Sequence, residues 1–186
     1  MKSSVLRPRL LAAGATVALA ASLATHQAHA GPGAPDVPDT IAVDGEHQPF
    51  LVTHAVGVQI YACRAGVNGP RWGLVAPRAD LYGQNDQLVG THFGGPRWQA
   101  KDGSTVVGQR VDGVTVDQTA IPWLLLSASG TAGPDGDRLA DTSFIQRVNT
   151  VGGVEPPAAE CTTATVGATD EVAYTADYYF WKPITE

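Results

Sequence analysis

Apolar and polar residues alternate most clearly near the C-terminus, in residues 172–180. Every second residue there is apolar or aromatic, and Thr175 and Asp177 lie between them. Because successive side chains of a strand point to opposite faces, this alternation predicts a half-buried β-strand. Other segments rich in β-branched and apolar residues predict further strands at residues 56–63, 72–76, 87–93, 105–116, 121–128 and 142–151.

Turn-forming residues separate these segments. They cluster at residues 68–70, 83–86, 94–96, 102–103, 133–137 and 152–153. The 21 glycines and 13 prolines leave no window with a sustained helical stripe. Short strands at this spacing are typical of an antiparallel sandwich or barrel. We expect an all-β domain of antiparallel β-sandwich or jelly-roll type.

The N-terminal residues have the pattern of a secretory signal peptide. Lys2, Arg7 and Arg9 precede an apolar run that ends in small residues at Ala28 and Ala30. We therefore expect residues 1–30 to be a signal peptide, residues 31–45 a flexible leader rich in Pro and Gly, and residues 46–186 a single β domain. The expected location is secreted, either extracellular or periplasmic.

Charge and hydropathy argue against two kinds of partner. The chain has 12 basic and 18 acidic residues, and three of the basic ones lie in the predicted signal peptide, which leaves a net charge of −9 after cleavage. A polyanion such as a nucleic acid is repelled by such a surface. No later stretch approaches the roughly 20 apolar residues of a membrane-spanning helix, so no membrane span is expected.

The two cysteines, Cys63 and Cys161, both lie in the predicted exported part. In an oxidising compartment such a pair predicts a disulfide bond, which would close a 98-residue loop and stabilise the fold by about 4–5 kcal/mol. The alternative is a catalytic or metal-binding thiolate. That alternative needs a His or Cys at ligand spacing, and neither cysteine has one.

The tetrapeptide Gly-Pro-Arg-Trp occurs twice, at residues 69–72 and 95–98. One interpretation is a pair of similar loops that present Arg and Trp to a ligand, and the four tryptophans of the chain would then form a sugar-stacking platform. The other is a Gly-Pro turn that opens a strand each time. We favour the second interpretation because only four residues match.

Sequence motifs give no reaction. The histidines His47, His54 and His92 share no short ligand spacing, and the acidic residues 135–141 lack the order of a calcium loop. Gly-x-Ser-x-Gly is absent, and no Gly-x-Gly-x-x-Gly follows a strand. We therefore expect no metal and no cofactor, and the catalytic residues, if there are any, are unknown.

The densest group of polar and aromatic residues lies in residues 92–104, around two turns. Here we expect His92, Trp98 and Asp102 to line a shared depression, with Arg147 as a distant contributor. Such a site would bind a small polar or saccharide-like ligand by stacking and hydrogen bonds. Each residue also has a structural interpretation: a half-buried histidine, a core tryptophan, an aspartate that caps backbone amides, and an arginine paired with a carboxylate or a strand-end carbonyl.

Several blocks resemble a known family. They read GVQIYAC at residues 57–63, WGLVAP at 72–77, VGTHFGGPRW at 89–98, DGS at 102–104, AIPWLLL at 120–126, IQRVNTVGG at 145–153 and YTADYYF at 174–180. In this order, together with Cys161, they resemble a family of secreted bacterial and fungal proteins of unknown function, DUF 3455. The resemblance implies an exported β-rich domain and no established activity.

From these observations we expect a secreted binding or interaction module with an unknown ligand. The alternative is an uncharacterised secreted hydrolase or metal-dependent enzyme. Convergence separates the two hypotheses, because an enzyme needs His92, Asp102 or Arg147 to meet in one cleft, whereas a module can scatter them.

Overall fold

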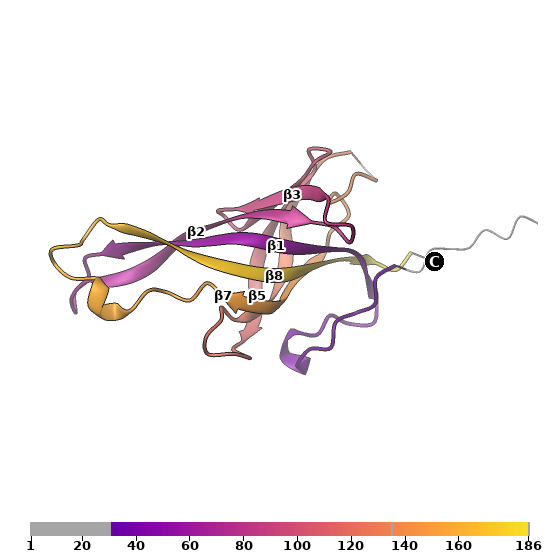
Figure 1. Ribbon diagram of the computed structural model, residues 1–186. Coiled ribbons are helices and arrows are strands. Elements are labelled where there is room, and N and C mark those ends of the chain that lie inside the picture. The colour runs from indigo at the N-terminus through magenta and orange to yellow at the C-terminus, as the bar shows by residue number, and fades with distance from the viewer. Residues whose placement is uncertain (1–30, 135, 186) are drawn as a thin grey trace, which may run out of the picture. The chain divides into compact units, whose positions relative to one another are not determined.

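Eight antiparallel strands, each hydrogen-bonded to its neighbour in sequence, form a closed barrel in the computed structural model, which describes residues 31–134 and 136–185 (Figure 1). The last strand pairs with the first and closes the sheet. The strands are β1 (His47–Arg64), β2 (Arg71–Tyr82), β3 (Leu88–Phe93), β4 (Arg97–Ala100), β5 (Thr105–Val114), β6 (Trp123–Ala132), β7 (Phe144–Gly152) and β8 (Thr169–Pro183). The predicted signal peptide lies outside the described residues.

The predicted all-β class, the antiparallel pairing and the single disulfide bond are confirmed. The sheet, however, closes on itself as a barrel, not as the sandwich or jelly roll that we expected. The sheet closes because its two longest strands, β1 and β8, pair with each other. They stay paired from His47 opposite Pro183 to Ala62 opposite Thr169, so that neither outer strand leaves an edge free to join a second sheet.

Helical structure is confined to two short 3-10 turns in the described part of the chain, η1 (Asp39–Ile41) and η2 (Ala158–Glu160). No helix that the structure describes has the length and apolar character needed to cross a membrane.

Both copies of the repeated tetrapeptide open a strand, as the favoured interpretation predicts. β2 begins at Arg71 and β4 begins at Arg97. β4 was not among the predicted strand segments. It has only four residues, which alternate between exposed and buried, and it fits between the turn at residues 94–96 and the turn at residues 102–103.

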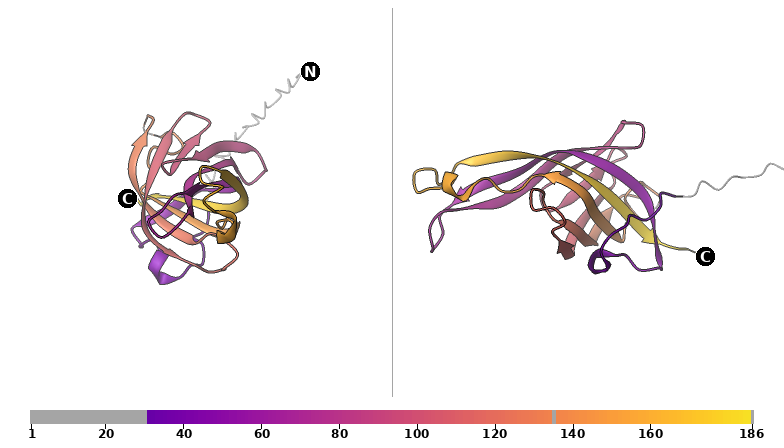
Figure 2. Two further views of the ribbon diagram at one scale, coloured as in Figure 1. Left: turned by 90° about the vertical axis from the view of Figure 1, so that its left-hand side faces the viewer. Right: turned by 60° about the horizontal axis from the view of Figure 1, so that its bottom comes forward.

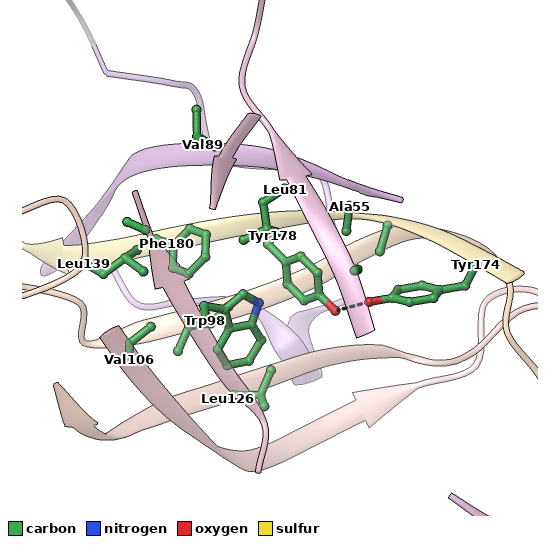
Figure 3. Packing of buried hydrophobic residues seen from close by; sticks show 14 of the residues in the cluster. Ala55, Leu81, Val89, Trp98, Val106, Leu126, Leu139, Tyr174, Tyr178 and Phe180 are labelled. Atoms are coloured by element: carbon green, nitrogen blue, oxygen red, sulfur yellow. Dashed lines mark hydrogen bonds between the residues drawn. The ribbon is translucent and has the colours of Figure 1, made fainter. Parts of the chain in front are cut away.

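Large aromatic side chains fill one part of the barrel interior. Trp98, Tyr178 and Phe180 are among the largest fully buried side chains of the protein. Figure 3 shows the Trp98 indole between Val106 and Leu126 on one side and the two β8 rings on the other. The ring centroid of Trp98 lies 5.3 Å from that of Tyr178 and 6.2 Å from that of Phe180, both in edge-to-face geometry, which is favourable for aromatic pairs.

The outer face of the barrel is partly covered by the segment that precedes β1. Ile41 of η1 is completely buried, and its carbonyl oxygen accepts a hydrogen bond of 2.6 Å from Nε2 of the buried Gln146 on β7. This part of the predicted flexible leader is therefore docked on the barrel through both an apolar and a polar contact.

The long strands β1, β2 and β8 continue past the shorter ones as a three-stranded ribbon, seen at the left of Figure 1 and again in the right-hand view of Figure 2. The disulfide joins Cys63, near the end of β1, to Cys161, which follows η2. The backbone of Cys63 also bonds in both directions with the β7–β8 connection, through Ala168 O and Gly167 N. The disulfide thus holds this connection against the ribbon.

Replacing both Cys63 and Cys161 by alanine is expected to lower the free energy of unfolding by about 4–5 kcal/mol, because the unfolded chain regains the freedom of a 98-residue loop. Urea unfolding of the double variant and the wild type measures the difference. An unchanged unfolding midpoint, or two cysteines that are alkylated without reduction, would contradict the prediction.

The docked leader gives a second prediction. Ile41→Ala should cost about 2–5 kcal/mol, as is usual for emptying a fully buried isoleucine site. The neighbouring Thr40→Ala is the control, since Thr40 is exposed in the same turn and its loss should stay within about 0.5 kcal/mol. Equal effects of the two substitutions in urea unfolding would show that the leader is not packed as described.

Candidate functional site

A partly open cavity of about 420 Å³ is lined both by buried residues of the barrel interior and by half-exposed residues of β2. Its apolar wall is built mainly from β2, from the segment that leads into β6 and from β6 itself, and includes Leu74, Val75, Ala76, Pro77, Pro96, Ile121, Pro122, Leu124 and Leu126. Its polar and aromatic groups come from six strands and are Gln59, Tyr61, His92, Trp98, Arg110, Arg147 and Tyr178. Three of the four predicted site residues, His92, Trp98 and Arg147, therefore line one cavity.

His92 and Trp98 are cross-strand partners on β3 and β4. Their rings are stacked, with centroids 4.3 Å apart and planes 11° from parallel. Both side chains are at least 97% buried, and both face the barrel interior. The sequence placed the two residues on one side of the sheet, and the structure agrees.

The His92 imidazole is held as a neutral group. Burial lowers its pKa to about 3, and the positive charge of Arg147 adds to this effect, although a hydrogen bond to Arg97 O acts in the opposite direction. In that bond Nδ1 lies 2.9 Å from the carbonyl oxygen, so Nδ1 carries the proton and donates it. The other ring nitrogen, Nε2, is therefore a hydrogen-bond acceptor.

Arg147 on β7 sits between Leu124 of β6 and Tyr178 of β8 in the strand register. Its Nε and Nη2 donate to the carbonyl oxygen of Pro122, at 3.1 and 2.8 Å. Of the partners expected from the sequence, the structure provides the strand-end carbonyl. No carboxylate of the described residues lies within ion-pair distance of this guanidinium.

Three tyrosines surround this part of the interior. Tyr61 OH donates to Gly153 O at 2.7 Å, and the hydroxyl groups of Tyr174 and Tyr178 are 3.5 Å apart (Figure 3). Burial raises the pKa of all three, and the charge of Arg147 acts against it; for Tyr178, hydrogen bonds with Tyr174 and Arg147 also act against it. The phenols are therefore protonated at neutral pH.

Two buried polar atoms on the cavity wall have no hydrogen-bond partner in the described part of the chain: Gln59 Nε2 and Trp98 Nε1. Unpaired buried donors are rare in folded proteins because each costs about 1–3 kcal/mol. Sequence reasoning did not single out Gln59, Tyr61 or Tyr178. Only their inward position in the alternation of β1 and β8 marks them.

Asp102 does not belong to this site, contrary to the prediction of a shared depression. Its Oδ1 accepts bonds from the backbone N and the hydroxyl of Ser104, at 3.0 and 2.6 Å, and its Oδ2 accepts one from Arg138 N at 2.8 Å. These bonds lower the pKa of the Asp102 carboxyl. Asp102 lies in the turn after β4. The cavity is lined instead by Gly95 and Pro96, which belong to the turn before β4. Asp102 therefore has the capping role.

The other histidines lie apart from the cavity. His47 Nδ1 is 2.7 Å from Asp44, and His54 Nδ1 is 2.9 Å from Asp177; His47 is partly buried and His54 is exposed. Within residues 31–134 and 136–185, no three His, Cys, Asp or Glu side chains come together as a potential metal site.

Comparison with known protein families matches residues 44–182 to the family described as "Protein of unknown function (DUF3455)". No curated protein matches the chain. No solved structure matches it either.

The buried neutral His92 predicts a specific loss of stability in acid. Because its pKa is about 3 in the folded protein against 6.5 for an ordinary histidine, the unfolded chain binds more protons between these pH values. The free energy of unfolding should therefore fall by about 1.4 kcal/mol per pH unit as the pH drops below 6.5, and this contribution is fully lost near pH 3.

The variant His92→Asn keeps an N–H near Arg97 O but cannot take up the proton, so its stability should depend less steeply on pH. Urea unfolding at about pH 7 and about pH 5 measures both proteins. The same loss between the two pH values in wild type and variant would show that His92 does not carry the effect.

Proposed function

Since the chain belongs to the DUF3455 family, which assigns no activity, we propose from the geometry of the site that the protein is a secreted binding module whose barrel cavity holds one small organic ligand. The observation that carries this proposal is the cavity of about 420 Å³, with apolar walls and a few converging polar groups. Pockets of roughly 300–1,000 Å³ with this type of lining are typical of small-molecule sites.

The unpaired donors support the same proposal. A barrel of eight strands is either filled by its own side chains or holds one small ligand. Here the aromatic cluster fills one part of the interior, while Gln59 Nε2 and Trp98 Nε1, beside the cavity, have no hydrogen-bond partner among the described residues. Buried atoms of Thr53, Gln146 and Trp181, which do not line the cavity, are unpaired in the described part of the chain as well, so the two donors support the proposal only together with the cavity beside them.

The mode of binding differs from the one expected from the sequence. A sugar ring stacks on an exposed aromatic face, but one face of Trp98 is covered by His92. On the other side, a Cβ atom placed on Gly108 would lie 2.9 Å from Trp98 Cζ3, so the chain itself packs there. We therefore propose recognition by hydrogen bonds and aliphatic contacts, without stacking on Trp98.

The lining residues favour binding over hydrolysis. A hydrolase of the expected type needs a Ser, Cys or Thr nucleophile, or a carboxylate that activates water. None of the described residues that line the cavity is a Ser, Thr, Cys, Asp or Glu. His92 therefore has no acid partner or nucleophile in the cavity that would make it part of a catalytic pair.

Export is part of the proposal and rests on two observations. The first is the signal-peptide pattern of the sequence, and the second is the disulfide between Cys63 and Cys161, since such bonds form and persist in oxidising compartments.

A library of small water-soluble compounds, screened by thermal shift on the wild-type protein, tests the binding proposal. Compounds that raise the melting temperature should lose this effect in Leu124→Trp, in which a larger side chain occupies the cavity. Leu74→Trp, at a half-exposed position of the cavity lining, is a second blocking variant that disturbs the fold less.

The control is Val151→Trp, which adds the same ring at an exposed position outside the cavity. It should leave the thermal shifts unchanged. The proposal is wrong if no compound stabilises the wild type, or if stabilisation persists in both blocking variants. Chemical conversion of a stabilising compound, followed by NMR, would instead support the enzyme hypothesis.

A further inference from the structure

We infer that the ligand of the cavity is a small organic anion, a carboxylate on an apolar body, whose carboxylate binds at Arg147. This inference rests on the proposed function and adds the chemical class of the ligand. It is argued from the charges of the cavity lining, from the unused donors of Arg147 and from the apolar residues of the same lining.

The charge of the lining is opposite to that of the chain. The protein has 18 acidic and 12 basic residues, yet the charged residues that line the cavity are the two arginines Arg110 and Arg147. Neither makes an ion pair with a carboxylate among the residues that the structure describes. An acidic protein with a locally positive cavity attracts an anion there and repels it elsewhere.

Arg147 has donors to spare. A guanidinium carries five N–H donors; the bonds to Pro122 O use one from Nε and one from Nη2, and a side-chain hydrogen bond to Tyr178 uses another, which leaves donors free. The group is half-buried, so part of its hydration is lost, and a neutral carbonyl replaces only some of it. A carboxylate, with two oxygens in one plane, matches the remaining donors and their charge.

The groups nearest to Arg147 do not compete for its charge. The phenol of Tyr178 is protonated because burial raises its pKa, and the His92 imidazole is neutral for the same reason. The positive charge of Arg147 therefore acts on the cavity without a counter-charge from the protein side chains that line it.

The rest of the lining fits an apolar body. Leu74, Ile121, Leu124 and Leu126 form much of the wall, and Leu74 is half-exposed. A ligand with one charged end therefore gains from burying its apolar end against these side chains, at about 25 cal/mol per Å² of apolar surface.

Four compounds of similar size separate the possible classes: 3-phenylpropanoate, its neutral amide 3-phenylpropanamide, the cation 3-phenylpropylammonium, and methyl β-glucoside. Calorimetric titration of the wild type should give the carboxylate at least about tenfold tighter binding than the amide, as expected for a charge-assisted hydrogen bond. The cation should not bind, and the affinity for the carboxylate should fall with added salt.

Arg147→Gln keeps a hydrogen-bond donor but removes the charge, so it should abolish the preference for the carboxylate over the amide. Arg110→Gln, at an exposed position that tolerates substitution, should reduce the preference in part. The matched control is Arg97→Gln, since Arg97 is exposed above the ring of Phe93 and does not line the cavity. It should retain the wild-type preference.

The outcomes distinguish this inference from the proposed function. If the amide, the cation or the glucoside binds as tightly as the carboxylate, the anion inference is wrong, while binding in the cavity stands. If the carboxylate preference survives in Arg147→Gln, the inference is wrong as well. Binding that persists in the Leu124→Trp and Leu74→Trp variants would overturn the cavity itself and with it the proposed function.

Discussion

The pairing of β1 with β8 is the constraint on which the rest of the structure depends. These are the longest strands, and they stay paired almost from end to end, with one register shift between Pro49 and Leu51, so that the sheet has no free edge. Closure turns one face of the sheet into an interior that must be either packed or occupied. The partition of that interior into a packed part and a hollow part follows from which residues point inward.

The packed part is organised around one indole. Trp98 is accommodated because Gly108, on the neighbouring strand, has no side chain, and because His92 lies flat against the indole ring. Together with Tyr178 and Phe180, these groups form a rigid aromatic layer. The layer also sets the chemistry of the cavity beside it, because it buries His92 in its neutral form and leaves Arg147 as the partly buried charge of the lining. The aromatic layer therefore determines both the packing of the interior and the charge of the cavity lining.

The strands and the disulfide were predictable, since period-two alternation and a pair of cysteines are local or easily counted signals. The barrel was not, because closure depends on the register between the first and last strands, which lie more than a hundred residues apart in the sequence. The Gly-Pro turn before β4 predicted that a strand opens there, but alternation did not identify it, since four residues give too short a pattern. The contacts of Ile41 with the barrel were not predicted, because no periodicity in residues 31–45 marks them.

The candidate site was predicted in part for a similar reason. His92 and Trp98 are six residues apart around a tight turn, so alternation alone places them on one face. Asp102 was grouped with them because it is close in sequence. Strand β4 separates the turn at residues 94–96, which lines the cavity, from the turn at residues 102–103, which contains Asp102. Gln59, Tyr61 and Tyr178 come from β1 and β8, and only barrel closure brings them to the cavity.

A crystal structure of the protein with bound 3-phenylpropanoate tests the central claim most directly, since it locates the ligand and the donors in one measurement. The account predicts the carboxylate inside the barrel, within about 3 Å of the Arg147 guanidinium, with the phenyl ring against Leu124 and Leu126. A carboxylate bound only on the outer surface, or a barrel interior filled by its own side chains, would contradict it.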